Sequence, residues 1–135
     1  MGGHGALIAA LKRPDLYKSV SALAPVANIV NCGRTNMLQQ LLGNDHNQWL
    51  EWDASELARK YSSDRELDIL VDQGTYDPLL DVLLPHKFAE AVAENQSSKL
   101  KCNLRMQAGY DHSYDFITAF IADHFDHHAR ILSKS

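Results

Sequence analysis

Hydrophobic residues gather along this chain in short blocks separated by polar turns, and the blocks differ in kind. Residues 2–13 are apolar on nearly every side of a helical wheel, and Pro14 closes the block, which predicts a helix buried on several sides. Residues 18–25 and 67–74 are short aliphatic runs that end in a proline and a glycine. Such runs are typical of strands buried on both faces of a parallel sheet.

The later blocks add helices and a third strand. After a loop-like start, the leucines and tryptophans within residues 26–62 predict two short helices. A helix is expected over residues 85–96, where a proline opens it. Residues 102–109 alternate apolar and polar positions, which predicts a strand near the edge of a sheet. Ser113 is the expected N-cap of a last helix that runs to about Leu132.

This alternation of helices and strands is typical of α/β proteins with a parallel sheet. Only three strands are expected against about five helices, and no strand precedes the first helix. Parallel sheets usually contain more strands, so we expect residues 1–135 to form one partial α/β domain, without an internal boundary, whose sheet lacks strands in front. The unpaired edge of the first strand would favour aggregation or a homodimer.

Composition narrows the class of protein without assigning a function. The 135 residues carry a net charge of −4, and their 13 lysines and arginines are scattered, so no surface for nucleic acid or anionic membrane is indicated. No apolar run approaches the roughly 20 residues of a membrane span, and no signal-peptide pattern is present. Cys32 and Cys102 lie far apart, which fits a reducing compartment. We expect both to be small buried side chains in a soluble cytoplasmic protein, with a reactive role as the alternative.

The candidate chemistry lies in the two loops that follow the second and third strands. Asp72 stands at the end of a strand, where we expect a structural carboxylate that bonds backbone amides. Asp77 follows the next turn and is free to reach across the top of the sheet. His112 lies between a strand end and a helix start, where an imidazole can act as a general base if an acid orients its other nitrogen. The alternative is a turn aspartate and a solvated histidine.

The order of these residues favours catalysis. α/β-Hydrolases carry serine, acid and histidine in that order, with the serine on a sharp strand-to-helix turn of type G-x-S-x-G. Asp77 and His112 match the last two members, each after its own strand. The opening “MGGHGAL” matches the half of the turn that follows the serine, with Met1 and Gly2 as the fourth and fifth positions of the motif. We therefore expect a serine directly before Met1 in a longer protein.

Several stretches together carry a resemblance to a known family: “MGGHGAL”, “SALAP”, “LDILVDQG..D”, “GYDHSYDFI” and “FIADH..HHA”. Over essentially all 135 residues the chain resembles the C-terminal half of the S-formylglutathione hydrolase family, also called esterase D. The resemblance implies an α/β-hydrolase fold without a cofactor. It also implies a cytosolic serine thioesterase that hydrolyses S-formylglutathione to formate and glutathione in formaldehyde detoxification, and that acts on small esters.

The resemblance also implies roles for individual residues. Asp77 would be the acid, His112 the base, and the backbone N–H of Met1 a donor of the oxyanion hole. Apart from the resemblance, Tyr110 and Tyr114 flank His112 in the sequence and are candidates to line an acyl or thiol pocket, with simple packing as an equal alternative. The serine itself has no counterpart here, so the chain alone is expected to be inactive and to need the N-terminal half of the domain as its partner. The alternative function is a non-catalytic truncated isoform or a pseudoenzyme fragment.

Two features depart from the expected chemistry. Where the family typically has a loop with Trp, Lys and Phe, this chain reads “CGRTNMLQQLLG”, which bears on recognition of the glutathione side. In the last helix, His124 and His128 lie four positions apart, a spacing that can bind a metal. No further ligand is placed to complete a site, so we expect no metal and interpret these histidines as packing residues of a docking helix.

Overall fold

Three parallel strands form the sheet, in the order β1–β2–β3. They are β1 (Val20–Leu23), β2 (Leu67–Gly74) and β3 (Leu100–Gln107). In this computed structural model, which describes residues 1–134, β2 lies in the middle. It pairs with β3 along its whole length and with β1 through residues 69–72. The expected partial α/β fold with three parallel strands is confirmed.

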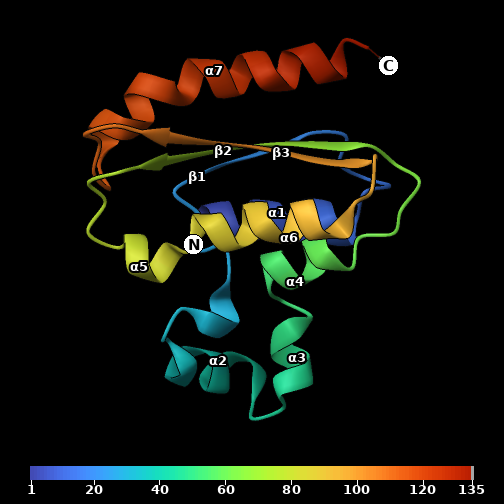
Figure 1. Cartoon of the computed structure of the whole chain (residues 1–135), viewed down its shortest axis with the longest axis vertical. Helices are drawn as coiled ribbons and strands as arrows, with labels where there is room; N and C mark the ends of the chain where they lie inside the picture. The colour runs from blue at the N-terminus through green and yellow to red at the C-terminus, as the bar shows by residue number, and fades with distance from the viewer. Residues whose placement is uncertain (135) are drawn as a thin grey trace.

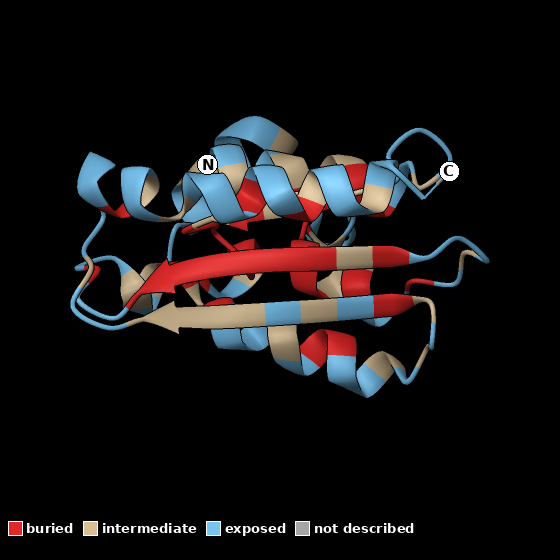
Figure 2. Cartoon of the chain, turned by 90° about the horizontal axis from the view of Figure 1, so that it is seen from above, coloured by how far each residue is buried: buried red, intermediate tan, exposed pale blue. Residues whose placement is uncertain are grey.

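Helices cover both faces of this sheet (Figure 1). The long helix α7 (Tyr114–Leu132) lies alone on one face. Helices α1 (Gly2–Lys12), α4 (Ala54–Arg59) and α6 (Pro85–Asn95) lie on the other face. Figure 2 shows the consequence for the strands: β2 is buried along nearly its whole length, whereas β3 is largely exposed or half-buried at the sheet edge.

Helix α1 packs closely against the strand that follows it. Leu7, Ile8 and Leu11 are buried within the main core, as the apolar block predicts. Gly3 lies so near the end of this strand that a Cβ added to it would sit 2.8 Å from the Cβ of Pro25. A side chain at this position would force the helix away from the sheet, so the glycine sets how closely the start of α1 approaches β1.

The segment between β1 and β2 differs from the prediction of two short helices. It contains a 3₁₀ turn, η1 (Ile29–Asn31), and three helices, α2 (Thr35–Leu42), α3 (His46–Leu50) and α4. The side chain of Asp45 accepts a hydrogen bond from the Asn47 N–H, and that of Asp53 accepts one from the Glu56 N–H. Each N-cap begins a separate helix, so α3 and α4 are two helices where the sequence predicted one.

Two smaller differences concern the loops that carry the candidate site. A four-residue helix, α5 (Leu80–Leu83), precedes α6, and Leu84 joins the two with a left-handed backbone (φ 53°). Ser113 precedes α7 as predicted, but its hydroxyl makes no capping hydrogen bond.

Within residues 1–134, no helix is both long and apolar enough to cross a membrane.

Candidate active site

An aspartate and a histidine meet beyond the carboxyl ends of β2 and β3. His112, in the loop after β3, donates from Nδ1 to Oδ2 of Asp77, in the loop after β2, over 2.8 Å. Because β2 and β3 are parallel and paired in register, their carboxyl ends place these loops side by side. The Asp77 side chain is buried, whereas 45% of the His112 side chain is exposed. The pair thus has a buried acid and an imidazole that solvent or a ligand can reach.

The surroundings of Asp77 keep its carboxylate charged. Burial raises the pKa of this carboxyl, but hydrogen bonds from His112, from the Leu79 N–H and from the Gln73 amide outweigh it, so the pKa lies below its ordinary value. A charged Asp77 favours the tautomer of His112 that carries its proton on Nδ1. The other ring nitrogen, Nε2, then has a free lone pair with which to accept a proton.

The two loops are joined directly to one another. The Thr75 N–H donates to the carbonyl of Gln107 over 3.0 Å, and the Tyr76 N–H donates to that of Tyr110 over 2.9 Å. A Cβ added to Gly74 would lie 2.2 Å from the same Tyr110 carbonyl oxygen. No side chain fits in that space, so the glycine that ends β2 allows the loop that carries Asp77 to touch the loop that carries His112.

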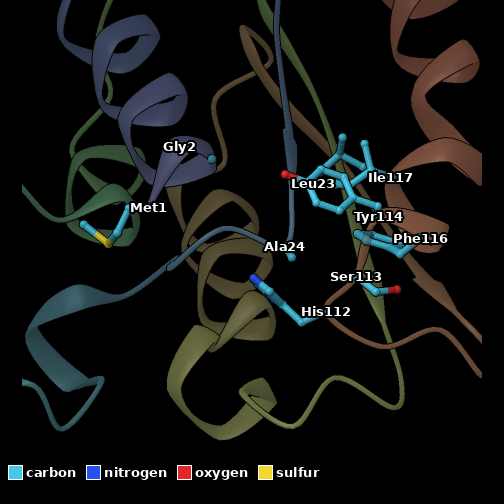
Figure 3. A pocket seen from close by; sticks show the side chains of 10 residues that line it. Met1, Gly2, Leu23, Ala24, His112, Ser113, Tyr114, Phe116 and Ile117 are labelled. Atoms are coloured by element: carbon cyan, nitrogen blue, oxygen red, sulfur yellow. The ribbon is translucent and has the colours of Figure 1, made fainter.

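A cavity of about 430 Å³ opens beside the histidine. His112 shares it with the start of α1, the end of β1 and the first turn of α7; its other lining residues are Met1, Gly2, Gly3, Leu23, Ala24, Ser113, Tyr114, Phe116 and Ile117. Figure 3 shows a ring nitrogen of His112 pointing toward the side where Met1 and Ala24 lie, while the Ser113 hydroxyl points the opposite way. The His112 ring therefore faces the N-terminus of α1 rather than the neighbouring Ser113.

The structure separates the two tyrosines that flank the histidine. Tyr114 lines the cavity and is 88% exposed. Tyr110 instead packs edge-on against Phe120, with ring centroids 4.9 Å apart, and lies near Phe116. Tyr114 is thus available to a ligand in this cavity, and Tyr110 belongs to the packing between its loop and α7.

Asp72 lies outside this site, within the interface between the sheet and α7. It is fully buried and binds Arg105 through both carboxylate oxygens, together with Gln107 (3.1 Å) and His124 (3.0 Å). Burial raises the pKa of Asp72, but the bonds from His124, Arg105 and Gln107 more than offset it and lower the pKa to about 2. Asp72 is structural, as expected, but the prediction that it bonds backbone amides is wrong, because its partners are side chains.

The histidines of α7 attach the helix to the sheet. His124 binds Asp72, while His128 forms hydrogen bonds with the hydroxyls of Ser19 (2.7 Å) and Ser21 (2.9 Å). His127 donates to the Val20 carbonyl over 3.1 Å. Residues 1–134 contain no group of three His, Cys, Asp or Glu side chains arranged to hold a metal ion.

One residue of the site escaped the sequence prediction. Gln73 is fully buried, and its amide donates to Asp77 over 2.9 Å. The available signal was a neutral polar residue near the end of an otherwise aliphatic strand, next to the glycine that closes it. Burying such a residue costs free energy unless it is hydrogen-bonded, so its position in the strand indicates a buried hydrogen-bond partner.

A parallel sheet with helices on both faces, and an Asp–His pair beyond the ends of its strands, define the α/β-hydrolase class. Within this class the chain belongs to the Esterase family, whose model, described as “Putative esterase”, matches residues 1–127.

Curated relatives agree with this assignment. The chain is 48% identical over 136 residues to an S-formylglutathione hydrolase from Mus musculus, and 46% identical over 134 residues to one from Arabidopsis thaliana. Each match covers 98% of this chain but only 47% and 46% of the relative, so the chain spans about half the length of these proteins. The resemblance found in the sequence is confirmed.

Solved structures agree as well. An S-formylglutathione hydrolase from Agrobacterium tumefaciens superposes with a TM-score of 0.86 at 37% identity, over 97% of this chain and 46% of that one. A ferulic acid esterase, at 21% identity and a TM-score of 0.64, covers 90% of this chain and 44% of its own, and shares the fold.

Proposed function

We propose that this chain carries the acid and the base of a serine thioesterase that hydrolyses S-formylglutathione to formate and glutathione, and that also cleaves small carboxylic esters. The hydrogen bond between Asp77 and His112, beside a cavity bounded by the N-terminus of α1, carries this proposal. The substrate follows from the relatives, which are S-formylglutathione hydrolases at 46–49% identity. Formaldehyde catabolism and a cytoplasmic location are part of the same proposal.

The proposed mechanism assigns one task to each group. His112 Nε2 takes the proton of a serine hydroxyl as the oxygen attacks the thioester carbonyl, and Asp77 stabilises the imidazolium that forms. The same proton passes to the departing thiolate of glutathione, and His112 then activates water to release formate. The N–H of Met1, at the start of α1, would donate to the oxyanion when Met1 is joined to a preceding residue.

The nucleophile in this proposal is a serine outside the 135 residues. Two observations support that choice. The ring of His112 faces the start of α1, and Ser113, the one serine among residues 1–134 that lines the cavity, points its hydroxyl away from the ring. The partner of the chain is accordingly the N-terminal half of the domain, whose strand would pair with β1. Without it, that free edge would pair with a second copy.

The cavity also supports a role for a tyrosine. Tyr114 is exposed at the rim, in the first turn of α7, and we propose that it contacts the acyl or thiol part of the substrate. Tyr110 contributes differently, since its backbone carbonyl and its ring hold the loop that carries His112.

A chimera tests the proposed function. Residues 1–135 are joined behind the preceding half of the Mus musculus relative, and hydrolysis of S-formylglutathione and p-nitrophenyl acetate is measured. We expect turnover of both by the chimera, and none above a denatured control by the 135 residues alone, because a triad without its serine retains only weak catalysis. A folded chimera without turnover would contradict the proposal and favour the non-catalytic fragment.

A further inference from the structure

Gln73 makes contacts that a side chain used only for packing does not need. Its Nε2 donates to Asp77 Oδ2 over 2.9 Å and to the carbonyl of Gly74 over 3.2 Å. The oxygen it reaches on Asp77 is the one that accepts the hydrogen bond from His112. We propose, building on the function proposed above, that Gln73 is a positioning residue that fixes the Asp77 carboxylate for its bond to the base.

Burial argues that the amide has a specific task. Gln73 is fully buried, and its Oε1 has no hydrogen-bond partner within the described residues. Its neighbours on β2, Leu70 and Val71, show that aliphatic side chains pack well in this strand. An amide with one unsatisfied atom is costlier to bury than such a side chain, so its presence here is explained by the bond it makes.

The orientation of the amide follows from the chemistry of its partner. A charged carboxylate only accepts hydrogen bonds, so the NH₂ group rather than Oε1 must face Asp77. The unsatisfied Oε1 is the consequence of that requirement.

The other contacts of Asp77 leave a task for Gln73. The Leu79 N–H holds Oδ1, while Oδ2 is held by His112 and Gln73. His112 is the titratable group in contact with Asp77, and its side chain is 45% exposed, so its ring is the least fixed of the three partners. Gln73, anchored in the central strand, is the rigid partner that keeps Oδ2 in place when the ring moves during proton transfer.

The test compares two glutamine-to-methionine substitutions that each remove one amide next to a buried aspartate. Q73M removes the donor to Asp77; the matched control Q107M removes a donor to Asp72, over 3.1 Å, outside the proposed site. The pKa of the Asp77 carboxyl is followed by ¹³C NMR in the folded chimera described above, where the preceding half of the domain covers the free edge of β1. We expect it to rise in Q73M and to stay unchanged in Q107M.

Kinetics in the chimera give the second measurement. Q73M should lower kcat about ten-fold, the size of one hydrogen bond to a charged group, with KM unchanged, and Q107M should lower neither. An unchanged titration of Asp77 in folded Q73M would overturn the inference, as would unfolding of both Q73M and Q73L, which would make Gln73 a residue of the fold. An inactive chimera with the expected titration would reject the proposed function alone.

Discussion

Two aspartate–histidine pairs lie near the end of β2, with their aspartates five residues apart, and their surroundings differ. Asp72 of β2 and His124 of α7 are 3.0 Å apart and both buried, between the sheet and the helix. Asp77 and His112 are 2.8 Å apart, but the histidine is about half exposed, beside a cavity. Since the pairs are alike in bond length and in residue type, what distinguishes them is which atoms remain open to another molecule.

The charges around the two pairs differ as well. Asp72 is paired with Arg105, whose pKa is raised by its hydrogen bonds to Asp72 and Asp123, so a permanent positive charge compensates this carboxylate. Asp77 has no such cation among its described partners. A proton gained by His112 would therefore be the charge that Asp77 stabilises, as a catalytic acid requires. The third partner of each aspartate therefore separates the structural pair from the pair that we propose to be catalytic.

The largest expected effect separates the two histidines. In the chimera, His112→Ala should lower kcat by about 10⁶-fold, because loss of the base disables the whole triad. His124→Ala should lower it far less, since this ring contacts no part of the cavity. Steady-state kinetics on both variants measure the contrast. Similar losses in the two would contradict the assignment of the base.

The two aspartates should differ in what their loss affects. Asp77→Asn should lower kcat by about 10⁴-fold, because the amide no longer holds the required tautomer of His112. Asp72→Asn should instead lower the free energy of unfolding by about 3 kcal/mol, since Arg105 then lacks its buried partner. Urea unfolding and kinetics on each variant test this. An Asp72→Asn variant as stable as the wild type, with a loss of activity equal to that of Asp77→Asn, would reverse the two roles.

The smallest expected effect is a dependence of stability on pH. The folded-state pKa of Asp72, about 2, lies below its unfolded value of 3.8. The stabilisation is therefore present above about pH 4 and is lost as the pH falls through the folded-state value, by about 2 kcal/mol in total. Unfolding measured between pH 5 and pH 2 should be less steep in Asp72→Asn. If the free energy of unfolding depended on pH equally in the variant and the wild type, the pKa of Asp72 would not be lowered in the folded state.

Local patterns were enough to predict most of the fold. The aliphatic run that ends at Gly74 matches β2, and the apolar period after Ser113 matches α7, because each signal is strong over many residues. The short helices were harder. The caps at Asp45 and Asp53 divide residues 26–62 more finely than hydrophobic periodicity shows, and α5 has only four residues.

The sequence singled out the two residues that the structure brings together, but not the geometry of their contact. Asp77 and His112 were indicated by their order along the chain, whereas their contact depends on how two loops meet in space. The partners of Asp72 could not be foreseen, since Arg105 comes from the neighbouring strand and His124 from a helix on the sheet face. Gln73 could be noticed as a polar residue near the end of an aliphatic strand. Its role could not be predicted, because it depends on where the loop after β2 places Asp77.

The close approach of Gly74 to the Tyr110 carbonyl has a consequence for how this protein can evolve. Two stretches of sequence about 35 residues apart share a space too small for one extra carbon atom, so neither can drift independently of the other. Replacing the glycine would require the opposite loop to move, and Asp77 and His112 would then no longer be held together. Mutational freedom at this end of the sheet is therefore greatest at outward-facing side chains, such as Tyr76 and Tyr114, which can change while the hydrogen bond between Asp77 and His112 is preserved.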